Sequence, residues 1–113
     1  MSPDPIDLPS ALKRIGGEKE FLRELLEIFE TDYREKADRL KKAVETGDFE
    51  SLKNIGHALK GASANLSLEP LKEACRSMEE AGEAGDTKQA GEALARMEAE
   101  HARLRAFLPG IFP

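Results

Sequence analysis

One stretch of sequence decides the fold of this chain: residues 49–66, which read FESLKNIGHALKGASANL. Its apolar residues recur at steps of three and four, the spacing of the buried stripe of an amphipathic helix, and they are Leu52, Ile55, Leu59, Ala62 and Leu66. At about 100° per residue, His57 lies about 180° from the middle of this stripe and points to solvent. The stretch predicts a helix that buries one face and presents a histidine on the other.

The sequence before this helix predicts one short and one long helix. The short helix covers residues 8–15, with Asp7 as its N-cap and Gly16-Gly17 as its stop. The long helix covers about residues 18–46 and ends at Gly47. Asp48 follows directly and can cap the helix of residues 49–66.

Two more helices are predicted after residue 66. Ser67 is a candidate N-cap for the first, which has Pro70 in its first turn and ends at a turn over residues 82–85. The run from Asp86 to Gln89 reads as a capping box that opens the last helix. We expect Pro109 and the glycine after it to end that helix, with residues 111–113 either packing back or fraying.

These segments together predict an all-α fold. Four amphipathic helices with short connections can bury their stripes only against one another, so we expect an antiparallel up-down four-helix bundle over residues 18–108. The short extra N-terminal helix would lie across one end. A length of 113 residues suits a single domain, residues 1–113, with one core.

Composition excludes several classes of protein. A net charge of −5 argues against a nucleic-acid partner, which would require a clustered basic face. No stretch approaches the roughly 20 apolar residues of a membrane span, and the N-terminus lacks the pattern of a signal peptide, so a cytoplasmic location is expected. The lone cysteine, Cys75, lies on an apolar stripe and is interpreted as a core residue.

The outward face around His57 suits an anion. Residues at helical spacing share this face with the histidine, and they are Lys53, Lys60, Gly61 and Ala64. Two lysines beside an imidazole would repel a metal ion, but they would stabilise a phosphoryl group on the ring nitrogen. Gly61 has no side chain to block a partner, and Gly56 and Ala64 are expected to keep the surrounding surface low.

The run HALKGASANL at residues 57–66 resembles the His-x-Leu-Lys-Gly-x-Ser/Ala motif of histidine-containing phosphotransfer (HPt) domains. Residues 21–29 resemble the first long helix of that family, and residues 71–79 resemble the helix that packs beside the histidine. The resemblance covers nearly the whole chain. One departure is Ser67, where the family often has glycine, and we expect it to change the local connection without changing the chemistry.

The resemblance implies a phosphorelay carrier. His57 would accept a phosphoryl group from an aspartate of a receiver domain, in the pathway of a sensor or hybrid histidine kinase, and pass it to the aspartate of another response regulator. Such a carrier needs no ATP site, and this chain has no glycine-rich phosphate loop, so it is not expected to be an enzyme. No cofactor is expected in the chain itself, because the receiver would supply Mg²⁺.

The resemblance also implies roles for the neighbouring residues. Lys60 would stabilise phosphate oxygens and Gly61 would permit close docking. Glu79, on the next helix, would orient the imidazole through its other nitrogen, although a solvated carboxylate is an equal alternative. Lys53 and Ala64 are weaker candidates for contacts with the phosphate or the partner. A bundle complete within one chain needs no second copy, so a monomer is expected.

Two other functions stay open at this stage. The first is a helical bundle that docks a receiver or kinase without carrying phosphate. The second is a metal-binding bundle, because Glu98-Ala-Glu-His101 matches the Glu-x-x-His motif of di-metal sites. The partner motif would need a glutamate where Asn54 stands, and His101 falls on the apolar stripe of the last helix. We therefore interpret His101 as a partly buried packing residue and predict no metal site.

Overall fold

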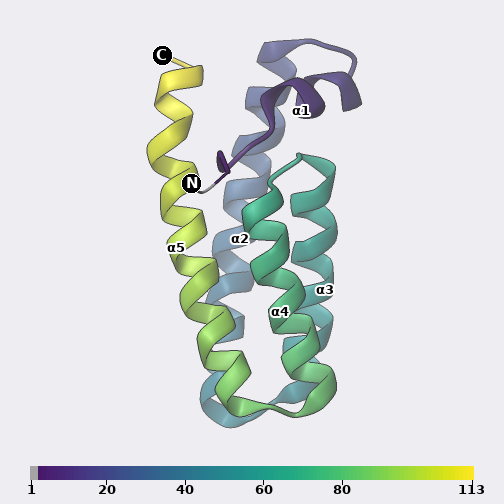
Figure 1. Ribbon diagram of the computed structural model, residues 1–113, viewed down its shortest axis with the longest axis vertical. Helices are drawn as coiled ribbons and strands as arrows, with labels where there is room; N and C mark the ends of the chain where they lie inside the picture. The colour runs from purple at the N-terminus through teal and green to yellow at the C-terminus, as the bar shows by residue number, and fades with distance from the viewer. Residues whose placement is uncertain (1–2) are drawn as a thin grey trace.

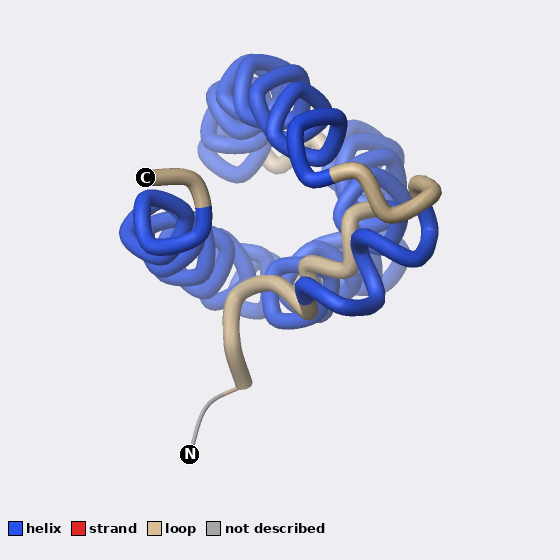
Figure 2. Tube along the Cα trace, turned by 90° about the horizontal axis from the view of Figure 1, so that it is seen from above, coloured by secondary structure: helices blue, strands red, loops and turns tan. Residues whose placement is uncertain are grey.

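The structure, a computed structural model, describes residues 3–113 and contains five helices over that range. They are α1 (Leu8–Arg14), α2 (Lys19–Thr46), α3 (Phe49–Asn65), α4 (Glu69–Ala84) and α5 (Thr87–Ile111). Helices α2 to α5 run alternately up and down and surround one axis in chain order, as Figures 1 and 2 show. The predicted all-α four-helix bundle with a short N-terminal helix is confirmed. Within the described range, no helix is long and apolar enough to cross a membrane.

The core of the bundle is built from the predicted stripes. Each long helix contributes fully buried side chains, among them Leu40, Leu52, Leu71 and Met97. Burying each such side chain stabilises the fold by about 1.5–3 kcal/mol. Cys75 is buried as predicted, and burial raises the pKa of its thiol to about 12. This thiol is therefore an apolar core group with little thiolate character at neutral pH.

Aspartates cap three helices as the sequence predicts. Asp7, Asp48 and Asp86 each accept a hydrogen bond from the backbone N–H three residues later. The capping box of α5 is only half formed, because the Gln89 side chain does not return to the cap. It donates instead to the carbonyl of Ser77 at 3.2 Å, which ties the start of α5 to α4.

The prediction that Ser67 caps α4 is wrong. The helix begins at Glu69, and Ser67 is buried in the α3–α4 turn with a φ of +56°. Its hydroxyl donates to the Ser10 hydroxyl at 3.0 Å, and its carbonyl accepts from the Asp7 N–H at 3.0 Å. Positive φ is the region that glycine adopts most readily, so a serine is an uncommon residue for this turn. In Figure 1, α1 lies above this turn at the end of the bundle.

The prediction that Pro109 ends the last helix is also wrong. Helix α5 continues through Pro109 to Ile111. The side chains of Ile111 and Phe112 pack against the core, and the ammonium of Lys19 lies 5.7 Å from the centre of the Phe112 ring. Proline in the last turn disturbs only one backbone bond, and the apolar contacts beyond it hold the turn in place.

The predicted turn over residues 82–85 is wrong as well, because α4 continues through Gly82 to Ala84 and only Gly85 stands outside it, as a C-cap with a φ of +64°. The remaining predicted helix ends differ by no more than two residues, as is usual for fraying ends.

Candidate functional site

The site is centred on His57, whose side chain is 69% exposed on α3. Its Nδ1 atom lies 2.8 Å from Oε2 of Glu79, which reaches across from α4 and is only 12% exposed. A carboxylate can only accept a hydrogen bond, so the neutral ring carries its proton on Nδ1. The lone pair is then on Nε2, the nitrogen that Glu79 does not occupy.

Lys60 shares the same carboxylate. Its Nζ atom lies 2.5 Å from Oε1 of Glu79, and its side chain is 29% exposed. The hydrogen bond from Lys60, with a smaller contribution from His57, holds the pKa of Glu79 below its ordinary value. The expectation that Lys60 is exposed and free to meet an anion therefore needs correction, because its ammonium is held by Glu79.

The two glycines near the histidine have different surroundings. Gly61 is exposed, and a Cβ atom built on it would meet no atom within 4 Å, as expected for a position open to a partner. Gly56 is buried, and a Cβ atom there would lie 2.8 Å from the backbone nitrogen of Glu79. The interpretation that Gly56 keeps the surface low for a partner is wrong, because this glycine faces α4.

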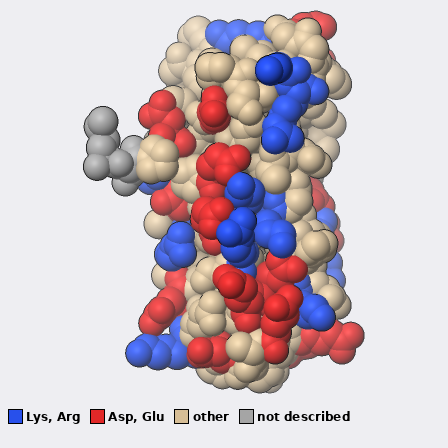
Figure 3. Space-filling view, turned by 45° about the vertical axis from the view of Figure 1, so that its right-hand side comes forward, with Lys and Arg blue, Asp and Glu red and all other residues tan. Residues whose placement is uncertain are grey.

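The remaining predicted residues lie on the outward side of α3. Lys53 is exposed one turn before His57, and Ala64 is half-buried one turn after Lys60. Figure 3 views the molecule with α3 and α4 forward, and basic side chains gather in the middle of this face beside acidic ones. The structure thus joins His57, Lys60 and Glu79 by hydrogen bonds and places Lys53, Gly61 and Ala64 on the same helix.

The side of α3 that faces α2 is uncharged. From His57 towards α2 the exposed residues are small or neutral, and they are Asn54, Ala58, Gly61 and Asn65. Beyond them lies a groove of about 700 Å³ between α2, α3 and the end of α1. Apolar residues that include Leu25 and Ile28 line it, with the charged Arg14 and Asp32 beside them. Ile28 is 66% exposed. This surface was not predicted from the sequence, although Ile28, an isoleucine outside the buried stripe of α2, was a signal for it.

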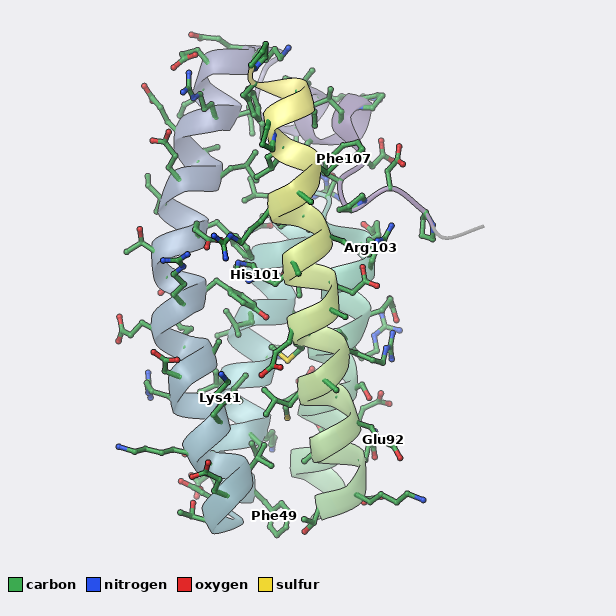
Figure 4. The ribbon with its side chains drawn as sticks, turned by 90° about the vertical axis from the view of Figure 1, so that its left-hand side faces the viewer. Lys41, Phe49, Glu92, His101, Arg103 and Phe107 are labelled. Carbon is green, nitrogen blue, oxygen red and sulfur yellow. The ribbon has the colours of Figure 1, made fainter. Side chains whose placement is uncertain are left out.

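The second histidine has a different environment. His101 points from α5 towards α2 (Figure 4), where its ring stacks on Tyr33 at 4.3 Å between centroids. Its Nε2 atom lies 2.6 Å from Oε2 of Glu30, and its side chain is 14% exposed. The predicted packing role is confirmed, while the bond to Glu30 was not foreseen. Glu98 lies 3.6 Å from Lys41, and no group of three metal-ligating side chains occurs among the residues that the structure describes.

Comparisons with known proteins give the family and the fold. Residues 24–107 match the family model of the Hpt domain. The fold is similar to that of histidine-containing phosphotransfer protein B (HptB) from Pseudomonas aeruginosa PAO1, with a TM-score of 0.82 and 28% sequence identity, covering 97% of this chain and 95% of that one.

A plant protein shares the fold at a lower identity. It is the histidine-containing phosphotransfer protein MtHPt2 from Medicago truncatula, with a TM-score of 0.78 and 22% identity, covering 84% of this chain and 66% of that one. Comparison with the curated proteins finds no match. Because the family model spans α3 with His57 and the helices that pack around it, the chain belongs to the Hpt domain family of two-component phosphorelays.

Proposed function

We propose that this protein is a phosphorelay carrier that accepts a phosphoryl group from a receiver aspartate on Nε2 of His57 and passes it to another receiver. The observation that carries the proposal is an exposed imidazole whose Nδ1 atom is held by Glu79 at 2.8 Å. That bond fixes the ring and directs the lone pair of the neutral form to Nε2. Membership of the Hpt domain family supports the same chemistry.

The proposed transfer forms one bond at the histidine and breaks one bond at the receiver aspartate. The Nε2 lone pair attacks phosphorus, an N–P bond forms, and the P–O bond to the receiver aspartate breaks with its electron pair leaving on the carboxylate. The ring gains positive charge as the bond forms, and the carboxylate of Glu79 at Nδ1 stabilises that charge. Transfer to the next receiver is the reverse reaction. The receiver, with its Mg²⁺, supplies the other half of the site.

Lys60 is assigned to the phosphoryl oxygens. In the structure its ammonium is held by Glu79, one turn along α3 from the histidine. A phosphoryl group adds about two negative charges, and a lysine has a flexible stem with three donors. We therefore expect the Lys60 ammonium to turn from Glu79 towards the phosphoryl group once it arrives. Lys53 would add a second, weaker positive charge, and Ala64 would allow close approach.

The receiver is proposed to dock on the uncharged side of α3 and the adjoining groove. This docking face comprises Ala58, Gly61 and Asn65 on α3, with Leu25 and Ile28 on α2. Ile28, which is 66% exposed, adjoins Leu25 in the lining of the groove, and exposed apolar side chains that form one patch are typical of a protein interface. The docking face begins beside His57, so a partner seated there would cover the reactive nitrogen and exclude water.

The proposal is tested by incubating the protein with a receiver that carries a radiolabelled phosphoryl group. Wild type should acquire an acid-labile label, and His57→Gln should acquire none. The chain has two histidines, so His101→Gln is the matched control and should be labelled like wild type. A label that persists on His57→Gln would overturn the proposal. Binding of the receiver without any label on wild type would indicate a docking bundle that carries no phosphate.

The role of Lys60 is tested by transfer kinetics. Lys60→Ala should slow transfer about 10-fold, the size of one charge-assisted hydrogen bond of about 1.5 kcal/mol. Lys53→Ala, a substitution of the same type one turn on the other side of His57, should have a smaller effect. Circular dichroism should show an intact fold for both variants. Equal transfer rates for wild type and Lys60→Ala would remove the assigned role.

A further inference from the structure

We infer that Gly56 and Gly82, by having no side chains, let the backbones of α3 and α4 touch. This contact fixes the distance between the helices and so the distance from His57 to Glu79. The two glycines would be positioning residues, since neither reaches the reacting nitrogen. This role in positioning the histidine rests on the proposed function, because it matters for phosphotransfer only if His57 carries the phosphoryl group. It explains why helix-weakening glycines stand in the interior of α3 and α4.

Gly56 contacts the backbone of the residue that holds the histidine. A Cβ atom on Gly56 would lie 2.8 Å from the nitrogen of Glu79, 3.1 Å from its Cα and 3.3 Å from the carbonyl oxygen of Cys75. His57 is the next residue along α3. The two residues of the hydrogen bond, His57 and Glu79, are therefore both located where the backbone of α3 contacts the backbone of α4.

Gly82 makes the reciprocal contact one turn away. A Cβ atom on this α4 residue would overlap the backbone nitrogen of Lys53 and would lie 2.7 Å from the carbonyl oxygen of Phe49. Gly82 follows Glu79 by three residues on α4, and Lys53 precedes Gly56 by three residues on α3. The helices thus touch backbone to backbone over a full turn next to the site.

Close contact of backbones leaves little freedom in the distance between the helices. Packed helices ordinarily keep their axes about 8–10 Å apart, and small residues allow a closer approach. The atoms that would meet an added methyl group at Gly56 belong to the backbone, so they cannot rotate aside. Alanine there would push α4 away, and a hydrogen bond of 2.8 Å is lost once its atoms are more than about 3.5 Å apart.

The experiment measures the ¹⁵N shifts of the His57 imidazole in the unphosphorylated protein at a pH where the ring is neutral. Glu79→Ala gives the shifts of a ring without its partner. Gly56→Ala should move the shifts more than half of the way to those of Glu79→Ala. Gly91→Ala is the matched control, because this α5 glycine has no atom within 4 Å of an added Cβ, and its shifts should equal those of wild type. Wild-type shifts in folded Gly56→Ala would overturn the inference.

A second variant covers the case in which Gly56→Ala does not fold. Glu79→Asp withdraws the carboxylate by one methylene and leaves both glycines in place. If the backbones already touch, the helices cannot move closer to restore the bond, and the ring shifts should match those of Glu79→Ala. Wild-type shifts in Glu79→Asp would show that the distance between α3 and α4 can adjust, and would contradict the inference. The measurement needs no phosphoryl donor, so failure of the proposed phosphotransfer leaves this result interpretable.

Discussion

Two helix interfaces of this bundle, called seams below, are built in opposite ways: one between α3 and α4, the other between α2 and α5. At the α3–α4 seam the backbones touch, because Gly56 and Gly82 remove the side chains that would separate them. At the α2–α5 seam side chains bridge the helices: the Tyr33 hydroxyl donates to the carbonyl of Met97 at 3.3 Å, and His101 bonds Glu30. Hollows of about 490 and 400 Å³ also lie along that second seam. The exposed histidine, His57, lies at the more tightly packed of these two helix interfaces.

A histidine bonded to a glutamate occurs at both seams, but the two histidines differ in exposure. His57 and His101 each bond one glutamate across a helix interface. The ring of His101 is stacked and mostly covered, while the ring of His57 is largely open. A bond between histidine and glutamate is therefore no mark of a reactive site by itself. Exposure of the ring distinguishes the two.

The largest effect is expected from a methyl group placed in the tight seam. Gly82→Ala should lower the free energy of unfolding by about 2–3 kcal/mol, because its Cβ would overlap the backbone of Lys53 and the strain exceeds the gain in helix propensity. Gly91→Ala, in open space on α5, should raise it by up to about 1 kcal/mol. Urea denaturation of both variants checks this pair. Similar values for the two would show that the seam has room.

A smaller effect is expected at the bridged seam. His101→Ala should lower the free energy of unfolding by about 1–2 kcal/mol, through loss of the stacked ring and of its bond to Glu30. His57→Ala, at the exposed position, should stay within about 0.5 kcal/mol of wild type. Thermal unfolding of the two variants under the same conditions measures the difference. A greater loss for His57→Ala would reverse the assignment of the two histidines.

The smallest effect concerns the acid response of Glu79. Its pKa is lowered by Lys60 and, to a lesser degree, by His57, so the ionised carboxylate stabilises the folded state. That contribution is complete above the ordinary glutamate pKa of about 4.3 and is lost as the pH falls through the lower folded value. The stability advantage of wild type over Glu79→Gln should therefore shrink between pH 7 and pH 3. Urea denaturation at both values tests this, and a constant advantage contradicts it.

Local sequence patterns predicted most of the fold. The three- and four-residue spacing of apolar side chains located every long helix, and the aspartate caps located three helix starts. The failures lie where distant contacts decide the structure. Ser67 is held in its turn by residues of α1, and Pro109 remains helical because the residues after it pack on the core.

The candidate site was predictable in its residues and less so in its contacts. The outward position of His57 follows from the helix wheel, and the partnership with Glu79 followed only from the family resemblance. The engagement of Lys60 depends on which carboxylate lies across the seam, and the role of Gly56 depends on which backbone it meets. No spacing within one helix contains that information, since both depend on the register between α3 and α4.

The bond from His57 to Glu79 has a consequence for the order of events in a relay. With Nδ1 bonded to Glu79, the ring has one free nitrogen, Nε2. Under the proposed function, a phosphoryl donor and a phosphoryl acceptor must therefore use it in turn. The two receivers would then compete for one binding site, so no ternary complex would pass the phosphoryl group directly between them. An excess of empty acceptor would then slow loading as well as speed unloading, and the flux would be greatest at intermediate acceptor concentrations.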